Sequence, residues 1–252
     1  MKYTFLILLV MMAAIGCKKE NNEKPAPEAV IVSASGDINP KLNEFRAILG
    51  DVLNTTPGQT SGRREINWDA VPDIYATQKL PSDFFNPVAA GSPPALQRGF
   101  RYSTEADARI SSNGFADFDA SNGTEFSSFS GTKTFSAVSS NLWNVDFEVA
   151  GQPVEASVRG FGAVFSDVDN GSSTTMEFFA GEKSLGVYPV PAKTTGNHSF
   201  LGVYFPKEKV TKVKIKQGEA VVANGVKDVS SGGTKDLVVM DDFLYDEPKA
   251  IQ

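Results

Sequence analysis

Two pairs of aspartates lie in otherwise apolar stretches of this sequence, and their chemistry needs an explanation. Asp167 and Asp169 end one apolar run, and Asp241 and Asp242 interrupt another near the C-terminus. A charged carboxylate among apolar side chains costs several kcal/mol when it has no partner. Each pair therefore requires an arginine, backbone donors or a metal ion.

Calcium is the metal ion that these residue types favour, because it binds about six to eight oxygens from carboxylates and backbone carbonyls. Aspartates at i and i+2 on one strand face lie about 6.5 Å apart, too far to chelate one ion unless the chain bends. The turn residues Asn170 and Gly171 could bend the chain after Asp167 and Asp169. Strict alternation would place the aspartates of the other pair on opposite faces of their strand.

The sequence therefore supports two hypotheses for these side chains. One is a structural calcium ion bound near Asp167, Asp169, Asp241 or Asp242. The other, which we favour at this point, is salt bridges to arginines together with turn formation, and the candidate arginines are Arg63, Arg64, Arg98 and Arg159.

Catalysis has little support in the sequence. His198 is the only histidine, so histidine metal clusters are excluded and any Ser-His-Asp triad would depend on this residue. It follows the turn residues Gly196 and Asn197, and no Gly-x-Ser-x-Gly elbow accompanies it. A carboxylate pair of the glycosidase type needs no histidine, but 30 acidic residues single out no pair. We therefore predict no enzyme and assign no catalytic residue.

The aromatic residues are predicted to be mostly core. Trp68 shares one strand face with Ile66, and Trp143 alternates in the same way with apolar neighbours. Loop-like surroundings make three other aromatics the candidates for stacking on a sugar ring, although buried packing is the favoured role for them as well; these are Tyr75, Phe84 and Phe85.

Cys17, the only cysteine, indicates where the protein resides. Lys2 precedes an apolar run of about a dozen residues, which is shorter than the ~20 that a membrane-spanning helix needs. The tetrapeptide 14–17, Ala-Ile-Gly-Cys, resembles the lipobox of bacterial lipoproteins, whose cysteine is lipidated and becomes the N-terminus after cleavage. This resemblance implies a signal peptide at residues 1–16 and a membrane anchor through lipid on Cys17.

The residues after Cys17 bear on localisation and partners. Lys18 stands where the inner-membrane retention signal of lipoproteins has aspartate, so the resemblance implies the outer membrane and leaves the membrane face open. Removal of residues 1–16 takes away one of the 24 basic residues and none of the 30 acidic ones, which leaves a net charge of −7. An acidic chain of this kind argues against nucleic acid as a partner.

The remaining sequence divides into a tether and one domain. Residues 17–38 are charged, contain prolines and lack aromatic side chains, which predicts a flexible, lipidated tether. Asn39-Pro40 opens an apolar pattern at helical spacing that Gly50 ends, so a short helix begins the domain at residues 39–252. With Cys17 lipidated, no disulfide is possible, and the domain must be stabilised by a packed core.

Strands dominate from Arg64 onward. Val213 and Ile215 alternate with three lysines, a pattern typical of a half-buried strand and also of a protected sheet edge. The runs 158–168, 200–205 and 237–244 are apolar on both faces, while the proline-bearing stretch 80–94 is predicted to be a loop. These patterns predict an all-β fold, a single antiparallel β-sandwich that is jelly-roll-like and has a short N-terminal helix.

Several sequence blocks between about residues 45 and 248 resemble an uncharacterised family of secreted bacterial β-sandwich proteins. The blocks are SGRREINWD at 61–69, DFFN at 83–86, RGF at 98–100, GFGAVFSDVD at 160–169, FLGV at 200–203 and VVMDDF at 238–243. The last block is also similar to the final strand of jelly-roll adhesion and carbohydrate-binding modules, in which an aspartate often helps to hold a structural cation. The resemblance implies one secreted domain and no particular mechanism.

Three functions follow as hypotheses. The first is a lipoprotein anchored in the outer membrane with a non-catalytic binding domain for glycan or an envelope protein, which should show a groove lined by exposed aromatics. The second is a structural or adhesive envelope protein without a small ligand, which should show a broad apolar patch instead. The third is a carboxylate-dependent carbohydrate-active enzyme, which should show two carboxylates about 5 to 9.5 Å apart across a cleft.

Overall fold

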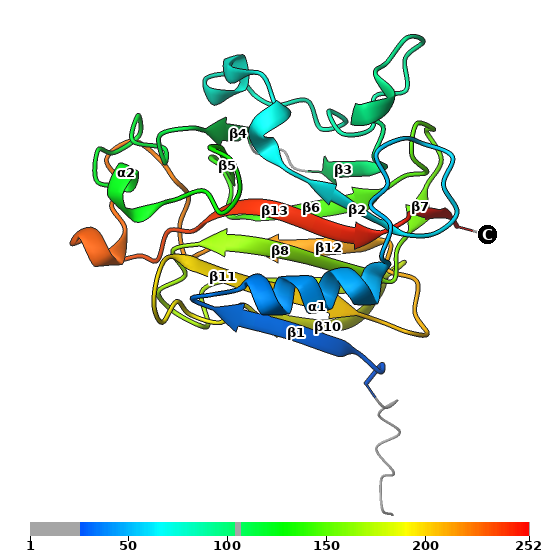
Figure 1. The fold of residues 1–252 in the computed structure, drawn as a ribbon. Coiled ribbons are helices and arrows are strands. Elements are labelled where there is room, and N and C mark those ends of the chain that lie inside the picture. Colours follow the sequence, from blue (N-terminus) through cyan, green and yellow to red (C-terminus); the bar gives the residue numbers. More distant parts are fainter. Residues whose placement is uncertain (1–25, 104–106, 252) are drawn as a thin grey trace, which may run out of the picture.

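The computed structural model describes residues 26–103 and 107–251, which form two antiparallel sheets packed face to face (Figure 1). The larger sheet has the strand order β1-β11-β8-β13-β5-β4, and β2 also pairs with β13. Its strands are β1 (Val30–Ser35), β2 (Arg63–Ile66), β4 (Ala108–Ser111), β5 (Thr134–Ala137), β8 (Gly160–Ser166), β11 (His198–Tyr204) and β13 (Val239–Asp246). The smaller sheet has the order β10-β9-β12-β6-β3 and consists of β3 (Phe100–Ser103), β6 (Leu142–Phe147), β9 (Thr175–Ala180), β10 (Lys183–Pro189) and β12 (Lys212–Lys216).

Eight of these strands have the connectivity of a jelly roll. The larger sheet contains the order β5-β13-β8-β11, and the smaller sheet contains β6-β12-β9-β10. Most consecutive strands among these eight lie in opposite sheets, and the two strand orders together form the two Greek keys of a jelly roll. The predicted all-β, jelly-roll-like sandwich is therefore confirmed.

The core between the sheets is built by the alternation that the sequence displays. Val213 and Ile215 on β12 are fully buried, whereas Lys214 between them is exposed. Trp68 and Trp143 are both buried, as predicted, and Trp68 stacks on Phe135 with ring centroids 4.2 Å apart. The lysine row, a pattern also typical of a protected sheet edge, does not lie at an edge here, because β12 pairs with β9 on one side and β6 on the other.

Helix α1 (Asn39–Leu49) covers the outer face of the larger sheet, which explains why strands there are apolar on both faces. Its Phe45 ring rests against two glycines, Gly162 and Gly202, that face each other in the β8–β11 ladder. A Cβ at Gly202 would lie 2.7 Å from the Phe45 ring, and one at Gly162 would lie 2.8 Å from it. The two glycines thus allow the helix to approach the sheet closely.

The predicted boundary between tether and domain needs correction. Residues 30–35, assigned above to the tether 17–38, form strand β1 and pair with β11 along its whole length. Val32 of this strand is buried beneath α1. Backbone pairing and the packing of Val32 and Ala34 hold the segment in the sheet, and the charged, proline-bearing part of the predicted tether precedes it. Cys17 and the predicted signal peptide at 1–16 lie outside the described residues.

The remaining elements are short. Helix α2 covers Asn122–Glu125, strands β7 (Ala156–Ser157) and β14 (Lys249–Ala250) pair with each other, and the 3-10 helices are η1 (Trp68–Ala70), η2 (Asp73–Ala76), η3 (Pro94–Leu96) and η4 (Val229–Ser231). The stretch 80–93 contains no strand, as predicted from its prolines. In the described part of the chain, no helix has the length and apolar character needed to cross a bilayer.

Candidate functional site

Asp241 and Asp242 lie at an irregularity of β13 and face the same segment. The pairing of β13 with β8 shifts register between Met240 and Phe243, so strict alternation fails at the two aspartates. Asp241 Oδ2 accepts the backbone N–H groups of Phe129 at 2.5 Å and Ser130 at 3.2 Å. The Ser130 hydroxyl donates to Asp242 Oδ1 at 2.6 Å. The expected placement on opposite faces is therefore wrong.

Burial determines the protonation of this pair. Burial, together with the nearby Asp242 carboxylate, raises the pKa of Asp241 to about 8, and burial also raises the pKa of Asp242. The two carboxylates interact closely, so the pair holds a proton near neutral pH. Among the described residues, neither aspartate belongs to a group of three acidic or histidine side chains close enough to share one ion. At this pair, the acidic and histidine side chains of the described chain therefore offer a metal two carboxylates and no third.

Asp167 and Asp169 meet because the chain bends at Asp167 itself, and not at Asn170 and Gly171 as expected. Asp167 follows the last residue of β8 and has a φ of 69°, in the left-handed region that non-glycine residues rarely adopt. The Lys193 ammonium contacts both carboxylates and lies 2.8 Å from Asp169 Oδ1. Burial raises the pKa of Asp167 to about 7 in spite of this lysine.

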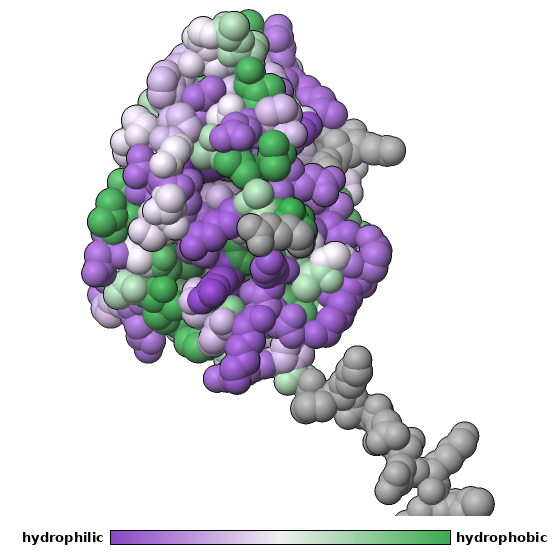
Figure 2. Space-filling view, turned by 90° about the vertical axis from the view of Figure 1, so that its right-hand side faces the viewer, coloured by the Kyte–Doolittle hydropathy of each residue, from purple (hydrophilic) through white to green (hydrophobic). Residues whose placement is uncertain are grey.

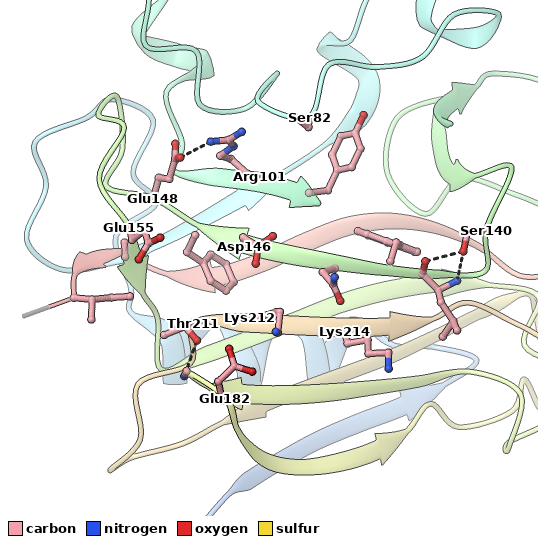
Figure 3. Close-up of a pocket in the computed structure, with 18 of the residues that line it drawn as sticks. Ser82, Arg101, Ser140, Asp146, Glu148, Glu155, Glu182, Thr211, Lys212 and Lys214 are labelled. Atoms are coloured by element: carbon pink, nitrogen blue, oxygen red, sulfur yellow. Dashed lines mark hydrogen bonds and ion pairs between the residues drawn. The ribbon is translucent and has the colours of Figure 1, made fainter. Parts of the chain in front are cut away.

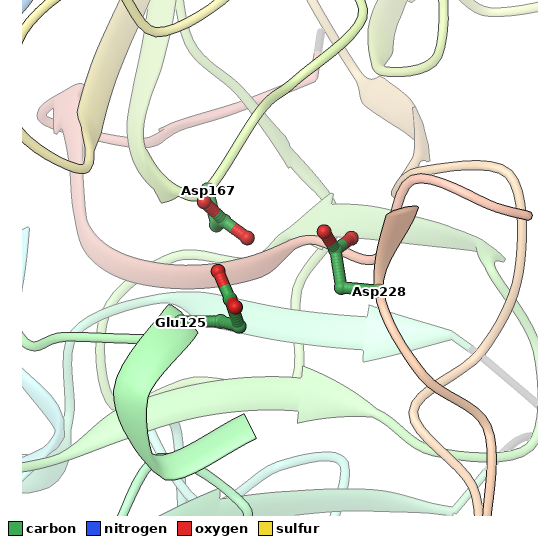
Figure 4. A group of neighbouring side chains, drawn as sticks. All are labelled: Glu125, Asp167 and Asp228. Carbon is green, nitrogen blue, oxygen red and sulfur yellow. The ribbon is translucent and has the colours of Figure 1, made fainter. Parts of the chain in front are cut away.

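Three further acidic residues, which the sequence did not single out, join Asp167 and Asp169. Carboxylate oxygens of Glu125, Asp167 and Asp228 all lie within 4.8 Å of one another, and the three side chains point toward one another (Figure 4). Asp169, Asp228 and Asp236 form a second such group. We call these five residues the acidic cluster. It is the one part of the described chain where several carboxylates converge closely enough to hold a metal.

The arginines proposed as partners do not neutralise these aspartates. Arg64 is fully buried and forms a two-pronged salt bridge with Glu247, both contacts being 2.7 Å. Arg63 pairs with Glu65 instead. In the described residues, the side chains of Arg98 and Arg159 likewise form no salt bridge with any of the four predicted metal ligands. The salt-bridge hypothesis is thus wrong for these partners, and Lys193 is the cation that contacts Asp167 and Asp169.

His198 and the candidate sugar-stacking aromatics have structural surroundings. The His198 ring is 3.1 Å from the carbonyl of Ser127, and no carboxylate is among its hydrogen-bond partners in the described chain. Phe85 is buried, and the half-buried Phe84 packs edge-on against both Phe85 and Tyr75. These aromatics pack on the core, as the favoured hypothesis expected.

A large groove crosses the outer face of the smaller sheet. It has a volume of about 1200 Å³ and follows β6 and β12 from Ser140 at one end to Glu155 at the other (Figure 3). Its aromatic lining residues are Tyr102, Trp143 and Phe147, and all three are buried. The expectation of exposed aromatics is therefore not met. The charged lining residues are Arg101, Asp146, Glu148, Glu155, Glu182, Lys212 and Lys214.

The strand register sets the charge pattern of this groove. Arg101 on β3 lies opposite Asp146 on β6, which in turn lies opposite Lys212 on β12. Arg101 also forms a salt bridge of 2.6 Å with Glu148 at the end of β6 (Figure 3). Within the described chain, Asp146 and Lys214 take part in no side-chain hydrogen bond or salt bridge. Positive and negative groups thus alternate across three neighbouring strands.

The surface in Figure 2 has a mixed character. On this face, hydrophobic residues of the described chain occur in groups separated by hydrophilic ones.

Comparison with known proteins adds no relative: no family model, curated protein or solved structure matches this chain. The resemblance of the sequence blocks to secreted bacterial proteins therefore stays a prediction.

Proposed function

We propose that this protein is a lipid-anchored envelope protein whose jelly-roll domain binds a glycan, without catalysis, in the groove over β3, β6 and β12. The observation that carries the proposal is the groove itself, which is long, open and lined by charged side chains from adjacent strands. The anchor in the outer membrane is supported by the lipobox resemblance at Cys17.

The size of the groove favours an extended ligand. Pockets for single small molecules measure about 300 to 1000 Å³ and enclose most of the ligand surface. A groove of about 1200 Å³ that lies open along two strands is larger than this range. It suits several linked sugar units better than one compact molecule.

The chemistry of the groove favours a polar ligand held by hydrogen bonds. Asp146 can accept hydrogen bonds from sugar hydroxyls, and Lys214 can donate to their oxygens. Because the aromatic lining residues are buried, ring stacking contributes little and the charged side chains supply the specificity. A hydrogen bond to a charged group contributes about 1.5 to 3 kcal/mol.

The position of the groove is compatible with the proposed anchor. Strand β1, the first element after the predicted lipid site, belongs to the larger sheet, and the groove lies on the smaller one. Attachment through the N-terminus therefore leaves the groove accessible. Another envelope protein is the alternative ligand, and it would use the same exposed side chains.

The test is glycan-array binding of the full chain in detergent, followed by calorimetric titration with an oligosaccharide that binds. We expect Asp146→Asn and Lys214→Ala each to weaken binding by about 10- to 100-fold. Asp51→Asn and Lys41→Ala are matched controls, because both residues are exposed and lie outside the groove.

Three outcomes would contradict the proposal. Absence of any glycan signal, with capture of an envelope protein that Lys214→Ala abolishes, would favour the alternative ligand. Equal binding by the groove variants and the wild type would place the site elsewhere. Cleavage of a bound glycan, lost in Asp146→Asn, would favour the carboxylate-dependent enzyme.

A further inference from the structure

The acidic cluster has far more negative charge than the surrounding protein neutralises. It joins five carboxylates: Glu125 in α2, Asp167 and Asp169 after β8, Asp228 before η4, and Asp236 before β13. Lys193 is the one cationic side chain in salt-bridge contact with any of them in the described residues. The cluster therefore has a formal excess of four negative charges when all five are ionised.

Burial makes this excess costly. Asp167 and Asp228 are fully buried, and Asp236 is 1% exposed. Asp228 and Asp236 satisfy their oxygens with hydroxyl and backbone donors; for example, the backbone N–H of Leu237 donates to Asp228 Oδ2 at 2.7 Å. Such donors reduce the energy of a buried carboxylate but do not cancel its charge.

Two buried oxygens in the cluster, Oδ2 of Asp167 and Oδ2 of Asp169, have no hydrogen-bond partner. Asp167 Oδ2 receives no hydrogen bond, although the residue is fully buried and its other oxygen contacts Lys193. Its carboxylate points toward those of Glu125 and Asp228 (Figure 4). A buried polar atom without a partner costs about 1 to 3 kcal/mol, more when it is charged. A cation between the three side chains would supply the missing partner.

We propose that Glu125, Asp167 and Asp228 bind one calcium ion, with Asp169 and Asp236 beside it and with Lys193 as a competing cation at Asp167 and Asp169. The site is separate from the groove, and the proposal does not depend on the glycan function. It keeps Asp167 and Asp169 from the original hypothesis and replaces Asp241 and Asp242 by residues of other loops.

The donor types favour calcium over magnesium and zinc. Two oxygens on opposite sides of a calcium ion, each about 2.4 Å from it, are about 4.8 Å apart. Oxygens of the three carboxylates lie within 4.8 Å of one another, so one calcium ion could contact all three. Magnesium binds at about 2.1 Å and demands strict octahedral geometry, and zinc prefers nitrogen and sulfur donors. The cluster contains neither histidine nor cysteine.

The ion would join three connections at one end of the sandwich. Glu125 belongs to the segment between β4 and β5, Asp167 to the β8–β9 connection, and Asp228 to the segment between β12 and β13. These segments are far apart in sequence and contain few strands of their own. Bound calcium is therefore expected to stabilise this end of the domain and to raise the melting temperature.

Calorimetric titration of the full chain with calcium chloride, after treatment with EDTA, tests the proposal together with thermal melts. At calcium concentrations about a hundred times Kd, the melting temperature should rise by about 5 to 10 °C. Magnesium chloride at equal concentration should produce a much smaller rise. No binding heat and an unchanged melt in the wild type would overturn the proposal, and an equal response to magnesium would overturn the assignment to calcium.

Variants locate the ion. Glu125→Gln and Asp167→Asn should each weaken calcium binding at least about tenfold, whereas Asp117→Asn, at an exposed position between the same strands, should bind normally. Lys193→Gln should tighten binding by about fivefold, because it removes a competing positive charge. If Asp167→Asn fails to fold, Glu125→Gln still tests calcium binding, because the Glu125 side chain is half-buried and its substitution should leave the protein folded. Unchanged affinity in both Glu125→Gln and Lys193→Gln would place the ion elsewhere.

Discussion

The Asp241–Asp242 pair and the acidic cluster are both buried carboxylate groups next to strands of the larger sheet, and they differ in what surrounds them. The pair has two carboxylates and three donors, the two backbone N–H groups and one hydroxyl of residues 129–130. The cluster has five carboxylates and one ammonium, together with hydroxyl and backbone donors such as the N–H of Leu237. Buried oxygens of Asp167 and Asp169 have no partner there, and neither does Asp241 Oδ1 in the pair. A shared proton reduces the charge of the pair, whereas the proposed calcium ion would reduce the charge of the cluster. The number of carboxylates that converge separates the two cases, since the five of the cluster have Lys193 as their one salt-bridge partner in the described chain.

Truncation of Asp241 should give the largest effect in this comparison. Asp241→Ala leaves the buried N–H groups of Phe129 and Ser130 without their acceptor, so we expect a loss of about 3 kcal/mol of unfolding free energy. Urea denaturation should give the same loss in calcium and in EDTA, with the exposed Asp51→Ala as control. A loss that depends on calcium would mean that the pair also contacts the ion.

The second-largest effect is expected in the pH dependence of the unfolding free energy, to which the Asp241–Asp242 pair and the acidic cluster both contribute. Burial raises the pKa of Asp167 to about 7 and that of Asp241 to about 8, while unfolded aspartate titrates near ~4. Between these values the folded state holds protons that the unfolded state has lost, so the unfolding free energy in EDTA should fall as pH rises from about 4 to 8.

Calcium should change only one part of this dependence. The ion displaces the proton from Asp167, so at saturating calcium Asp167 should no longer make the unfolding free energy fall as the pH rises. The decrease caused by Asp241 should remain. Asp246, whose pKa burial raises to about 6, contributes equally in both conditions. Urea titrations at pH 5 to 8, with and without calcium, measure the difference. Parallel curves in the two conditions would contradict a calcium ion at Asp167.

The smallest effect is expected from Asp241→Asn. The pair already holds a proton at pH 7, so a neutral amide of the same shape should change stability by less than about 1 kcal/mol. The equivalent change at Asp167 should abolish the stabilisation by calcium while it costs little in EDTA. Chemical denaturation of both variants with and without calcium makes the comparison. A large loss for Asp241→Asn would show that the pair is fully ionised.

The strands and the core could be predicted from local pattern. Val213 and Ile215 alternate with lysines because one face of β12 is buried and the other faces solvent. This period of two is visible in the sequence. The runs that are apolar on both faces, such as the one containing β8, are explained by a layer that covers the outer face of the larger sheet. The sequence did not reveal that α1 is this layer, or that Gly162 and Gly202 make room for Phe45.

The order of the strands within each sheet could not be predicted from local pattern. β12 has the composition of an edge strand and yet lies between β9 and β6, because long-range pairing decides the order of strands. Residues 30–35 fall in the predicted tether with the charged residues before them, although Val30, Ile31 and Val32 are β-branched, and they form strand β1 by pairing with β11. The irregular register at Asp241 and Asp242 also arises from the partner strand, and no local pattern marks it.

The sequence by itself determined the all-β class, the identity of the core residues and the expectation of a lipid anchor at Cys17, because these depend on periodicity and on a short contiguous motif. Only the tertiary structure decided which carboxylates meet. Glu125, Asp167 and Asp228 come from three separate connections, and jelly-roll connectivity places these at one end of the sandwich. Their proximity depends on the path of the whole chain, so local sequence carries no signal for it.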